Sequence, residues 1–263
     1  MSGCTEWARS TAPELREAFA RPCVGLWPIG ATEQHGPHVI TGFDHLAAQE
    51  VVQRAVAALG QHAVMLPPLT VGCSDHWLGL GATLSIGQET MISLIRDVCR
   101  SASSAGLAHL IIVNGHMGNV GAAMSAVSSL FDLPCRVQFV SYWDLIGAGA
   151  VSSLLAADNA VGHAGEFETS IALSLPGYVR EHELPGSGEP FALPIGQVGI
   201  YRPVRVEPGH GNGVVGDPSR ASARTGAQLV ELACAALERL CRSIIEPELS
   251  SVSDRSERGG TRS

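Results

Sequence analysis

Apolar runs of strand length alternate with helical patterns along the first half of the chain. The apolar runs lie at 23–29, 63–66, 109–113 and 135–141 and are typical of buried strands. Between and around them, apolar residues recur at helical spacing, with predicted helices near 13–20, 44–59, 88–105 and 119–131. This alternation predicts an α/β fold in which a mostly parallel sheet is covered by helices on both faces.

The pattern loosens in the second half of the chain. A helix is predicted at about 166–175, and residues 176–218 form a long stretch rich in Pro and Gly. Connections longer than about 12–15 residues usually serve as lids, binding loops or oligomer contacts, with disorder as the alternative. A last amphipathic helix is predicted near 219–245. We therefore expect one domain over residues 1–247 and a disordered, Ser/Arg-rich tail over 248–263.

Composition narrows the class of protein. The 263 residues are 45% hydrophobic, which is enough for one sizeable core. A formal net charge of -8 and 17 scattered basic residues argue against a nucleic-acid partner. No apolar run approaches the roughly 18 residues that span a bilayer, and the first twenty residues are charged where a signal peptide would be apolar. These features predict a cytoplasmic protein with neither a nucleic-acid nor a membrane partner.

Four polar clusters fall in or beside the loops that follow predicted strands. They are Glu33/His35/His38/Asp44, Ser74/Asp75/His76, Asn114/His116/Asn119 and His163/Glu166/Glu168. In open α/β sheets ligands bind beyond the carboxyl ends of the strands, so the clusters are expected to meet at one edge. Each residue alone has an ordinary structural role as a turn residue, a helix cap or a complement to a helix dipole. The combination is what predicts a functional site.

The residue types indicate metal chemistry. Carboxylates and imidazoles without thiolates suit zinc, manganese or iron(II), and such a site can hold two divalent ions bridged by one aspartate. Paired ions activate water and polarise a carbonyl, a recurrent solution for amide hydrolysis. His163 or a free carboxylate could then supply the proton for the leaving nitrogen. Glu166 and Glu168 lie about 200° apart on a helix, so only one can face the site that His163 faces. Dinucleotide, P-loop and serine-hydrolase signatures are missing from the sequence.

Three motifs together resemble the creatininase (creatinine amidohydrolase) family over roughly residues 20–240. They are PIGATEQHGPH at 28–38 followed by Asp44, Asn-Gly-His at 114–116, and His-Ala-Gly-x-x-Glu-Thr at 163–169. The resemblance implies a three-layer α/β/α sandwich and two divalent metal ions per chain, with zinc favoured over manganese or iron. It also implies hydrolysis of carbon–nitrogen bonds and a homo-oligomer, often a hexamer.

The resemblance implies roles for individual residues as well. The implied metal ligands are Glu33, His35, Asp44, His116 and Glu168. Asp44 stands at the place of the bridging carboxylate, and His163 matches the catalytic histidine, with Glu166 as the second catalytic candidate and the alternative ligand. The segment 72–85 is similar to a family loop beside the substrate. The expected substrate contacts are Ser74, Asp75, His76, Trp77 and Asn114.

Two places depart from the family pattern. In the loop that the family commonly builds from the sequence Phe-Pro-Gly-Thr, Gly81 stands in place of the proline and Ala82 in place of the glycine. Gly118 stands where creatininase itself has a glutamate, although other family members share this glycine. If neither Glu166 nor Glu168 binds a metal ion, a single-ion enzyme is the alternative.

Three functional hypotheses follow. The favoured one is a metal-dependent amidohydrolase that uses metal-activated water to cleave the amide or cyclic amide bond of a small polar substrate. The second is a peptidase that trims a short ribosomal-peptide precursor in redox-cofactor biosynthesis, which the family resemblance also covers. The third is a metal-binding protein that has lost catalysis, motivated by the departures at Gly81 and Gly118.

Overall fold

A five-stranded parallel sheet forms the centre of the molecule. The computed structural model describes residues 5–156, 162–186, 206 and 211–259. The strands follow the order β1-β3-β2-β4-β5, and all their pairings are parallel. They are β1 (Thr5–Glu6), β2 (Val24–Ile29), β3 (Ala63–Met65), β4 (His109–Asn114) and β5 (Arg136–Ser141). The short edge strand β1 was not predicted from the sequence, whereas the other four were.

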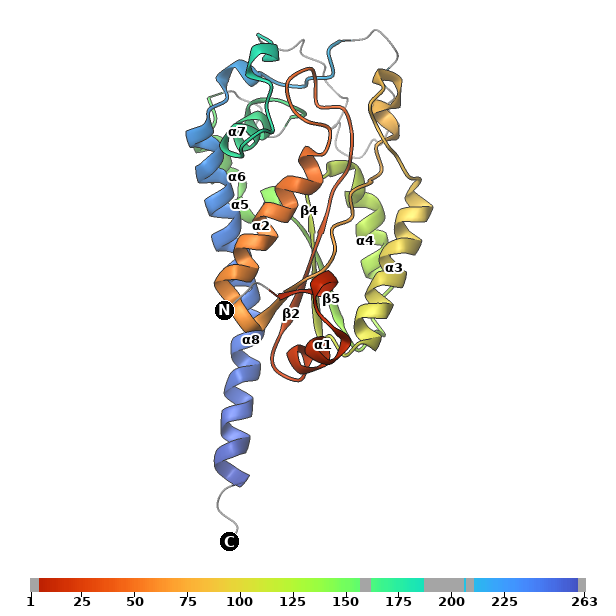
Figure 1. Ribbon diagram of the computed structural model, residues 1–263, viewed down its shortest axis with the longest axis vertical. Helices are drawn as coiled ribbons and strands as arrows, with labels where there is room; N and C mark the ends of the chain where they lie inside the picture. The colour runs from red at the N-terminus through yellow and green to blue at the C-terminus, as the bar shows by residue number, and fades with distance from the viewer. Residues whose placement is uncertain (1–4, 157–161, 187–205, 207–210, 260–263) are drawn as a thin grey trace.

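Helices cover both faces of this sheet (Figure 1). They are α1 (Ala12–Phe19), α2 (Phe43–Leu59), α3 (Gln88–Ser104), α4 (Val120–Ser128), α5 (Tyr142–Ile146), α6 (Ala148–Leu154), α7 (Glu166–Ser174) and α8 (Ala223–Gly259). Helices α2, α5, α7 and α8 pack on one face, and α3 and α4 pack on the other. The predicted three-layer α/β/α sandwich is confirmed.

The central strand β2 shows how the layers are divided. Val24 and Leu26 belong to the core beneath α2 and α8, while Trp27 and Ile29 belong to the core beneath α3 and α4. Successive side chains of a strand point to opposite faces, and all six residues of β2 are buried. This burial on both faces explains why the strand reads as a continuous apolar run rather than an alternating one.

Two glycines at the strand ends bring helix α2 close to the sheet. A Cβ atom added to Gly30, just after β2, would lie 2.3 Å from the backbone nitrogen of His45. A Cβ atom on Gly115, just after β4, would lie 2.1 Å from the backbone oxygen of Asp44. Because only hydrogen fits at both positions, the first turn of α2 rests on the ends of β2 and β4. This contact places Asp44 at the carboxyl edge of the sheet.

The second half of the chain differs from prediction in two respects. The residues between β5 and residue 157, where no element was predicted, form the short helices α5 and α6, separated by Gly147 with a φ of 84°. Helix α8 continues through Pro247 to Gly259, although we expected a helix end near 245 and a disordered tail. Most of the 176–218 stretch lies outside the described residues. Within the described helices, no segment is both long and apolar enough to cross a membrane.

Candidate metal centre

The predicted clusters meet at the carboxyl edge of the sheet. Glu33 and His35 follow β2, and His116 follows β4, whose last residue pairs with the last residue of β2. Asp44 lies in the first turn of α2. His163 and Glu168 come from the start of α7 and the residues just before it. Within the described residues, these side chains form three groups with metal-ligand spacing, Glu33/His35/His163, Glu33/His76/His116 and His35/Asp44/Glu168.

Asp44 lies between two imidazoles. Its Oδ1 atom is 3.0 Å from His35 Nε2, and its Oδ2 atom is 2.9 Å from His116 Nδ1. The carboxylate is buried, and burial alone would raise its pKa. The charges of His35 and His116 outweigh burial and hold the pKa of Asp44 well below its usual range. One carboxylate that presents a different oxygen to each of two ligand groups has the arrangement required of a bridge between two ions.

The three histidines of the centre share one pattern of hydrogen bonding. In each, one ring nitrogen lies against a backbone carbonyl oxygen: His35 Nδ1 is 3.1 Å from Glu33 O, His116 Nε2 is 3.1 Å from Cys73 O, and His163 Nε2 is 2.7 Å from Gln34 O. A carbonyl only accepts, so these nitrogens carry a proton, and in the neutral form of each ring the other nitrogen is the one whose lone pair can bind a metal ion. Metal-binding histidines are oriented in this way.

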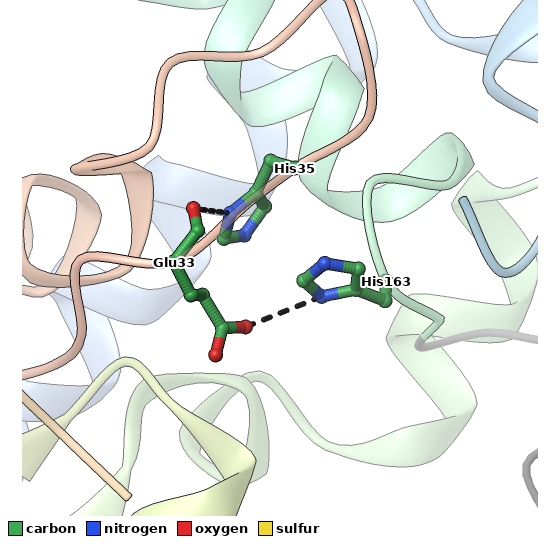
Figure 2. Close-up of side chains that lie close together, drawn as sticks. All are labelled: Glu33, His35 and His163. Atoms are coloured by element: carbon green, nitrogen blue, oxygen red, sulfur yellow. Dashed lines mark hydrogen bonds and ion pairs between the residues drawn. The ribbon is translucent and has the colours of Figure 1, made fainter. Parts of the chain in front are cut away.

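His163 stands beside both carboxylate and aromatic groups. Its Nδ1 atom is 3.4 Å from Glu33 Oε1. Figure 2 shows this contact together with that of His35 to the backbone of Glu33. The indole of Trp77 stacks on the imidazole, with 4.2 Å between ring centroids and 25° between planes. Burial, reinforced by the charge of His35, lowers the pKa of His163 well below its ordinary value. The residue is therefore a neutral imidazole with Nδ1 free to accept a proton.

Buried atoms at the centre fit divalent ions. Within the described residues, Glu33 Oε2, His35 Nε2 and Asp44 Oδ2 are buried without a hydrogen bond of acceptable geometry. Buried polar atoms without hydrogen bonds are costly, and a bound ion is one of the recognised explanations. The oxygen and imidazole donors here are those that zinc and manganese accept in proteins. The residues present therefore fit the predicted metal ions.

The ionisable groups of the centre have shifted pKa values. Burial raises the pKa of Glu33 and of Glu168 to about 7. Burial opposes charge on His35 and His116, but the neighbouring carboxylates outweigh it and raise their pKa values to about 10 and about 9. The cluster thus holds several protons near neutral pH, and a metal ion would have to displace them.

The expected substrate contacts divide into two sets. Trp77 and Ser74 are buried beside the centre, the hydroxyl of Ser74 lying 3.2 Å from His116 Nε2, and His76 groups with Glu33 and His116. Asp75 instead accepts a hydrogen bond from Ser85 Oγ at 2.6 Å.

Asn114 holds the turn after β4. Its Oδ1 atom accepts from the backbone nitrogen of His116 at 3.1 Å, and its Nδ2 atom donates to the backbone oxygen of His116 at 2.7 Å. These bonds orient His116, which is a different role from the expected contact with substrate.

The two glutamates of α7 point in different directions. Glu168 Oε2 lies 3.7 Å from His35 Nε2 and belongs to the group with His35 and Asp44. Glu166 Oε1 accepts a hydrogen bond from the backbone nitrogen of Ala156 at 2.8 Å, and Glu166 belongs to none of the metal-ligand groups of the described residues.

Three polar residues have supporting roles that the sequence did not predict. Gln34 lies against His163, with 2.9 Å between its Nε2 and the imidazole Nε2, and donates to Gly213 O. Asn119 joins the loop that contains Cys73 to the loop after β2, since its Oδ1 accepts from Cys73 N and its Nδ2 donates to Gly30 O. His38 Nε2 lies 2.8 Å from Thr169 Oγ1 at the start of α7. Their positions inside the motifs were the only signal, because amides and neutral imidazoles of this kind carry no distinctive spacing.

Comparisons with known proteins define the class. The profile of the creatininase family, described as creatinine amidohydrolase, matches residues 8–241, so the chain belongs to the creatininase family. A mycofactocin precursor peptide peptidase of Mycolicibacterium smegmatis is 33% identical over 212 residues, 78% of each chain. Creatinine amidohydrolase of Pseudomonas putida is 29% identical over 172 residues, 59% of this chain and 65% of the other.

Solved structures of creatininases have the same fold. A crystal structure of creatinine amidohydrolase matches with a TM-score of 0.76 at 24% identity, covering 92% of this chain and 98% of the other. A creatininase variant described as Zn–Zn type matches with a TM-score of 0.77 at 25% identity over 91% and 98%. The family and these relatives confirm the predicted resemblance and the predicted enzyme class, a hydrolase of carbon–nitrogen bonds.

Proposed function

We propose that this chain is a metal-dependent amidohydrolase that cleaves the amide bond of a small polar substrate at a two-ion centre. The observation that carries the proposal is the position of Asp44, with one carboxylate oxygen beside His35 and the other beside His116. One ion would be held by His35, Asp44 and Glu168, and the other by Glu33, Asp44 and His116. Zinc is favoured, with manganese or iron as alternatives. Bound ions would lower the pKa of water and polarise the scissile carbonyl.

His163 has the properties of the proton carrier in this reaction. Its pKa is lowered by burial and by the charge of His35, so the imidazole is neutral and Nδ1 can accept a proton from water. The hydrogen bond from Nε2 to Gln34 O keeps the ring in that orientation. The same Nδ1 then returns the proton to the leaving nitrogen. Trp77, stacked on the ring, excludes solvent from its face.

A short peptide is the second candidate substrate. The observation in its favour is the greater similarity to the peptidase relative, 33% identity over 78% of the chain, than to the P. putida amidohydrolase, 29% over 59%. A peptide bond and a cyclic amide are both carbon–nitrogen bonds, so the same side chains would serve. The choice depends on the substrate pocket rather than on the metal ligands.

Metal content tests the two-ion centre. Wild-type protein purified without chelator should contain close to two divalent ions per chain by plasma mass spectrometry, and Asp44→Asn should lose both because it serves both groups. Asp97→Asn removes an exposed carboxylate of α3 and should match wild type. Metal-free wild-type protein that takes up no zinc or manganese on titration would overturn the proposal.

Turnover tests the role of His163. Wild type should hydrolyse at least one member of a panel of creatinine, formamides and short peptides. His163→Ala should keep its metal ions and lose about 10²–10⁴-fold in kcat, the usual contribution of a positioned acid or base. A protein with two bound ions and no activity on any amide would instead support the hypothesis of a metal-binding protein without catalysis.

Two further predictions concern the whole molecule. The resemblance implies a homo-oligomer, often a hexamer, which light scattering of the purified protein would test. We also expect a cytoplasmic location, which fractionation of cells that produce the protein would test.

A further inference from the structure

The segment 72–85 forms a closed loop over the metal centre. Its two ends are joined, since Ile86 N donates to Gly72 O at 3.0 Å and Ser74 N donates to Ser85 Oγ at 2.8 Å. Asn119 accepts from Cys73 N at 2.9 Å, which fixes the loop to the turn after β4. The loop therefore has a defined position relative to His116, and side chains on its inner face are held against the centre.

His76 lies on that inner face. Its ring is parallel to the ring of His116, with 5.9 Å between centroids and 4° between planes. His76, Glu33 and His116 can each offer a ligand atom, and these atoms lie within 4.8 Å of one another. The backbone oxygen of His76 accepts a hydrogen bond from Val206 N at 2.9 Å, which helps to hold His76 in place. Within the described residues, the ring nitrogens of His76 make no hydrogen bond, so they are available to an ion.

We propose that His76 is a further protein ligand of the ion held by Glu33 and His116. This inference rests on the two-ion centre proposed above and assigns His76 to the metal rather than to the substrate. Zinc sites in proteins commonly have three or four protein ligands. With His76 added, the ligands of this ion are Glu33, Asp44, His116 and His76.

The turn after β4 cannot supply such a ligand. A Cβ atom on Gly118 would lie 2.2 Å from Cys73 O and 2.4 Å from His116 Nε2. The backbone of the 72–85 loop thus occupies the space that a side chain at position 118 would need. The loop therefore excludes a metal-binding side chain at position 118, and it provides His76 instead. Binding of this ion is consequently coupled to the position of the loop.

Cobalt(II) titration of the full-length protein tests the proposal. In His76→Phe an aromatic ring remains beside His116 while both ring nitrogens are lost. Wild type should bind two Co²⁺ per chain. The variant should bind one ion with unchanged affinity and the other at least about tenfold more weakly, because even residues that only support the metal ligands contribute about 10–100-fold to affinity. The Co²⁺ form should also lose one hyperfine-shifted, solvent-exchangeable imidazole N–H resonance relative to wild type.

Control variants keep the outcomes distinct. His62→Phe removes a half-buried histidine whose Nδ1 bonds to Pro22 O, and it should leave both affinities and the resonance count unchanged. Circular dichroism of the metal-free proteins checks folding, and His76→Gln provides a second variant with the same expectation. Two affinities within twofold of wild type in a folded variant, with no resonance lost, would overturn the role of His76 and leave the two-ion centre intact. Failure of wild type to bind two ions would overturn both proposals.

Discussion

Glu168 Oε2 lies 3.7 Å from His35 Nε2. The same oxygen accepts a hydrogen bond of 2.6 Å from the backbone nitrogen of Ala164, whose φ of 51° turns the chain into α7. Glu166, on the other side of the helix, accepts from Ala156 N instead. The helical separation of about 200° that left the choice open in the sequence is therefore resolved in favour of Glu168 as the side chain that faces the centre.

Exchange of the two glutamates for glutamine should separate their roles. Glu168→Gln should reduce bound metal by about one ion per chain, because it removes a charged oxygen from the group with His35 and Asp44. Glu166→Gln should retain the metal and cost about 1 kcal/mol of stability, because the amide oxygen still accepts from Ala156 N but without the assistance of the charge. Metal analysis and urea denaturation of both variants give the two quantities. Loss of metal from Glu166→Gln alone would reverse the assignment.

Metal binding should release protons. The raised pKa values of His35, about 10, and His116, about 9, mean that both imidazoles carry an extra proton at pH 7 in the metal-free protein. A divalent ion displaces these protons, so affinity should fall as pH falls below about 9, by about tenfold per pH unit for each proton displaced. Calorimetric titration with zinc in buffers of different ionisation enthalpy counts the protons. An affinity that does not vary between pH 6 and pH 9 would contradict this expectation.

The same pKa values predict that the metal-free protein becomes less stable as pH rises, whereas its affinity for metal ions increases. A pKa raised by folding stabilises the native state fully below the unfolded value, which is about 6.5 for histidine. That contribution of His35 and His116 should be lost as pH rises through about 9 to 10. Thermal melting of chelated protein across this range should show a falling Tm, while the metal-loaded protein should not show this fall. A Tm of the chelated protein that stays constant to pH 10 would contradict the argument.

The strands that carry the site could be predicted from the sequence, since burial on both faces produces uninterrupted apolar runs. Predicted ranges 23–29 and 109–113 match β2 and β4 within one residue. The edge strand β1 could not be predicted, because two residues become a strand only through pairing with β3. Helices α5 and α6 have only 5 and 7 residues, and α6 is rich in Gly and Ala, so neither gives a clear hydrophobic periodicity.

The site shows a similar division. Residue type and position after predicted strands indicated the four polar clusters. The resemblance to the creatininase family then implied Glu33, His35, Asp44 and His116 as metal ligands. Gln34 and Asn119 act by joining loops that are distant in the sequence, and their partners are backbone atoms. No sequence pattern reports such contacts. The sequence also could not show whether Glu168 or Glu166 faces the centre, because this depends on the residue at which α7 begins.

Two adjacent positions in the 72–85 loop test backbone strain. Gly81 and Ala82 both have positive φ values, 75° and 49°, and a Cβ atom added to Gly81 would have open space around it. Ala82→Gly should stabilise the protein by about 0.5–1 kcal/mol because glycine adopts this region without steric cost. Gly81→Ala should destabilise it by a similar amount for the converse reason. Urea midpoints of the metal-free proteins measure both changes, and equal effects of the same sign would rule out strain as the cause.

Gly118 and Gly121 form a matched pair for the contact between the loop and the turn after β4. In Gly118→Ala the new methyl group would meet Cys73 O at 2.2 Å, so the loop or His116 must shift. We expect a loss of about 1–3 kcal/mol in stability, the usual cost of overpacking, together with weaker binding of one metal ion. Gly121 lies in α4, and a methyl group added there would have no atom within 4 Å, so Gly121→Ala should gain about 0.5–1 kcal/mol through helix propensity and leave metal binding unchanged. Urea denaturation and zinc titration of both variants measure these effects. Wild-type stability and metal affinity in Gly118→Ala would show that the loop is not held against this turn, and would contradict the coupling between the loop and the ion held by Glu33 and His116.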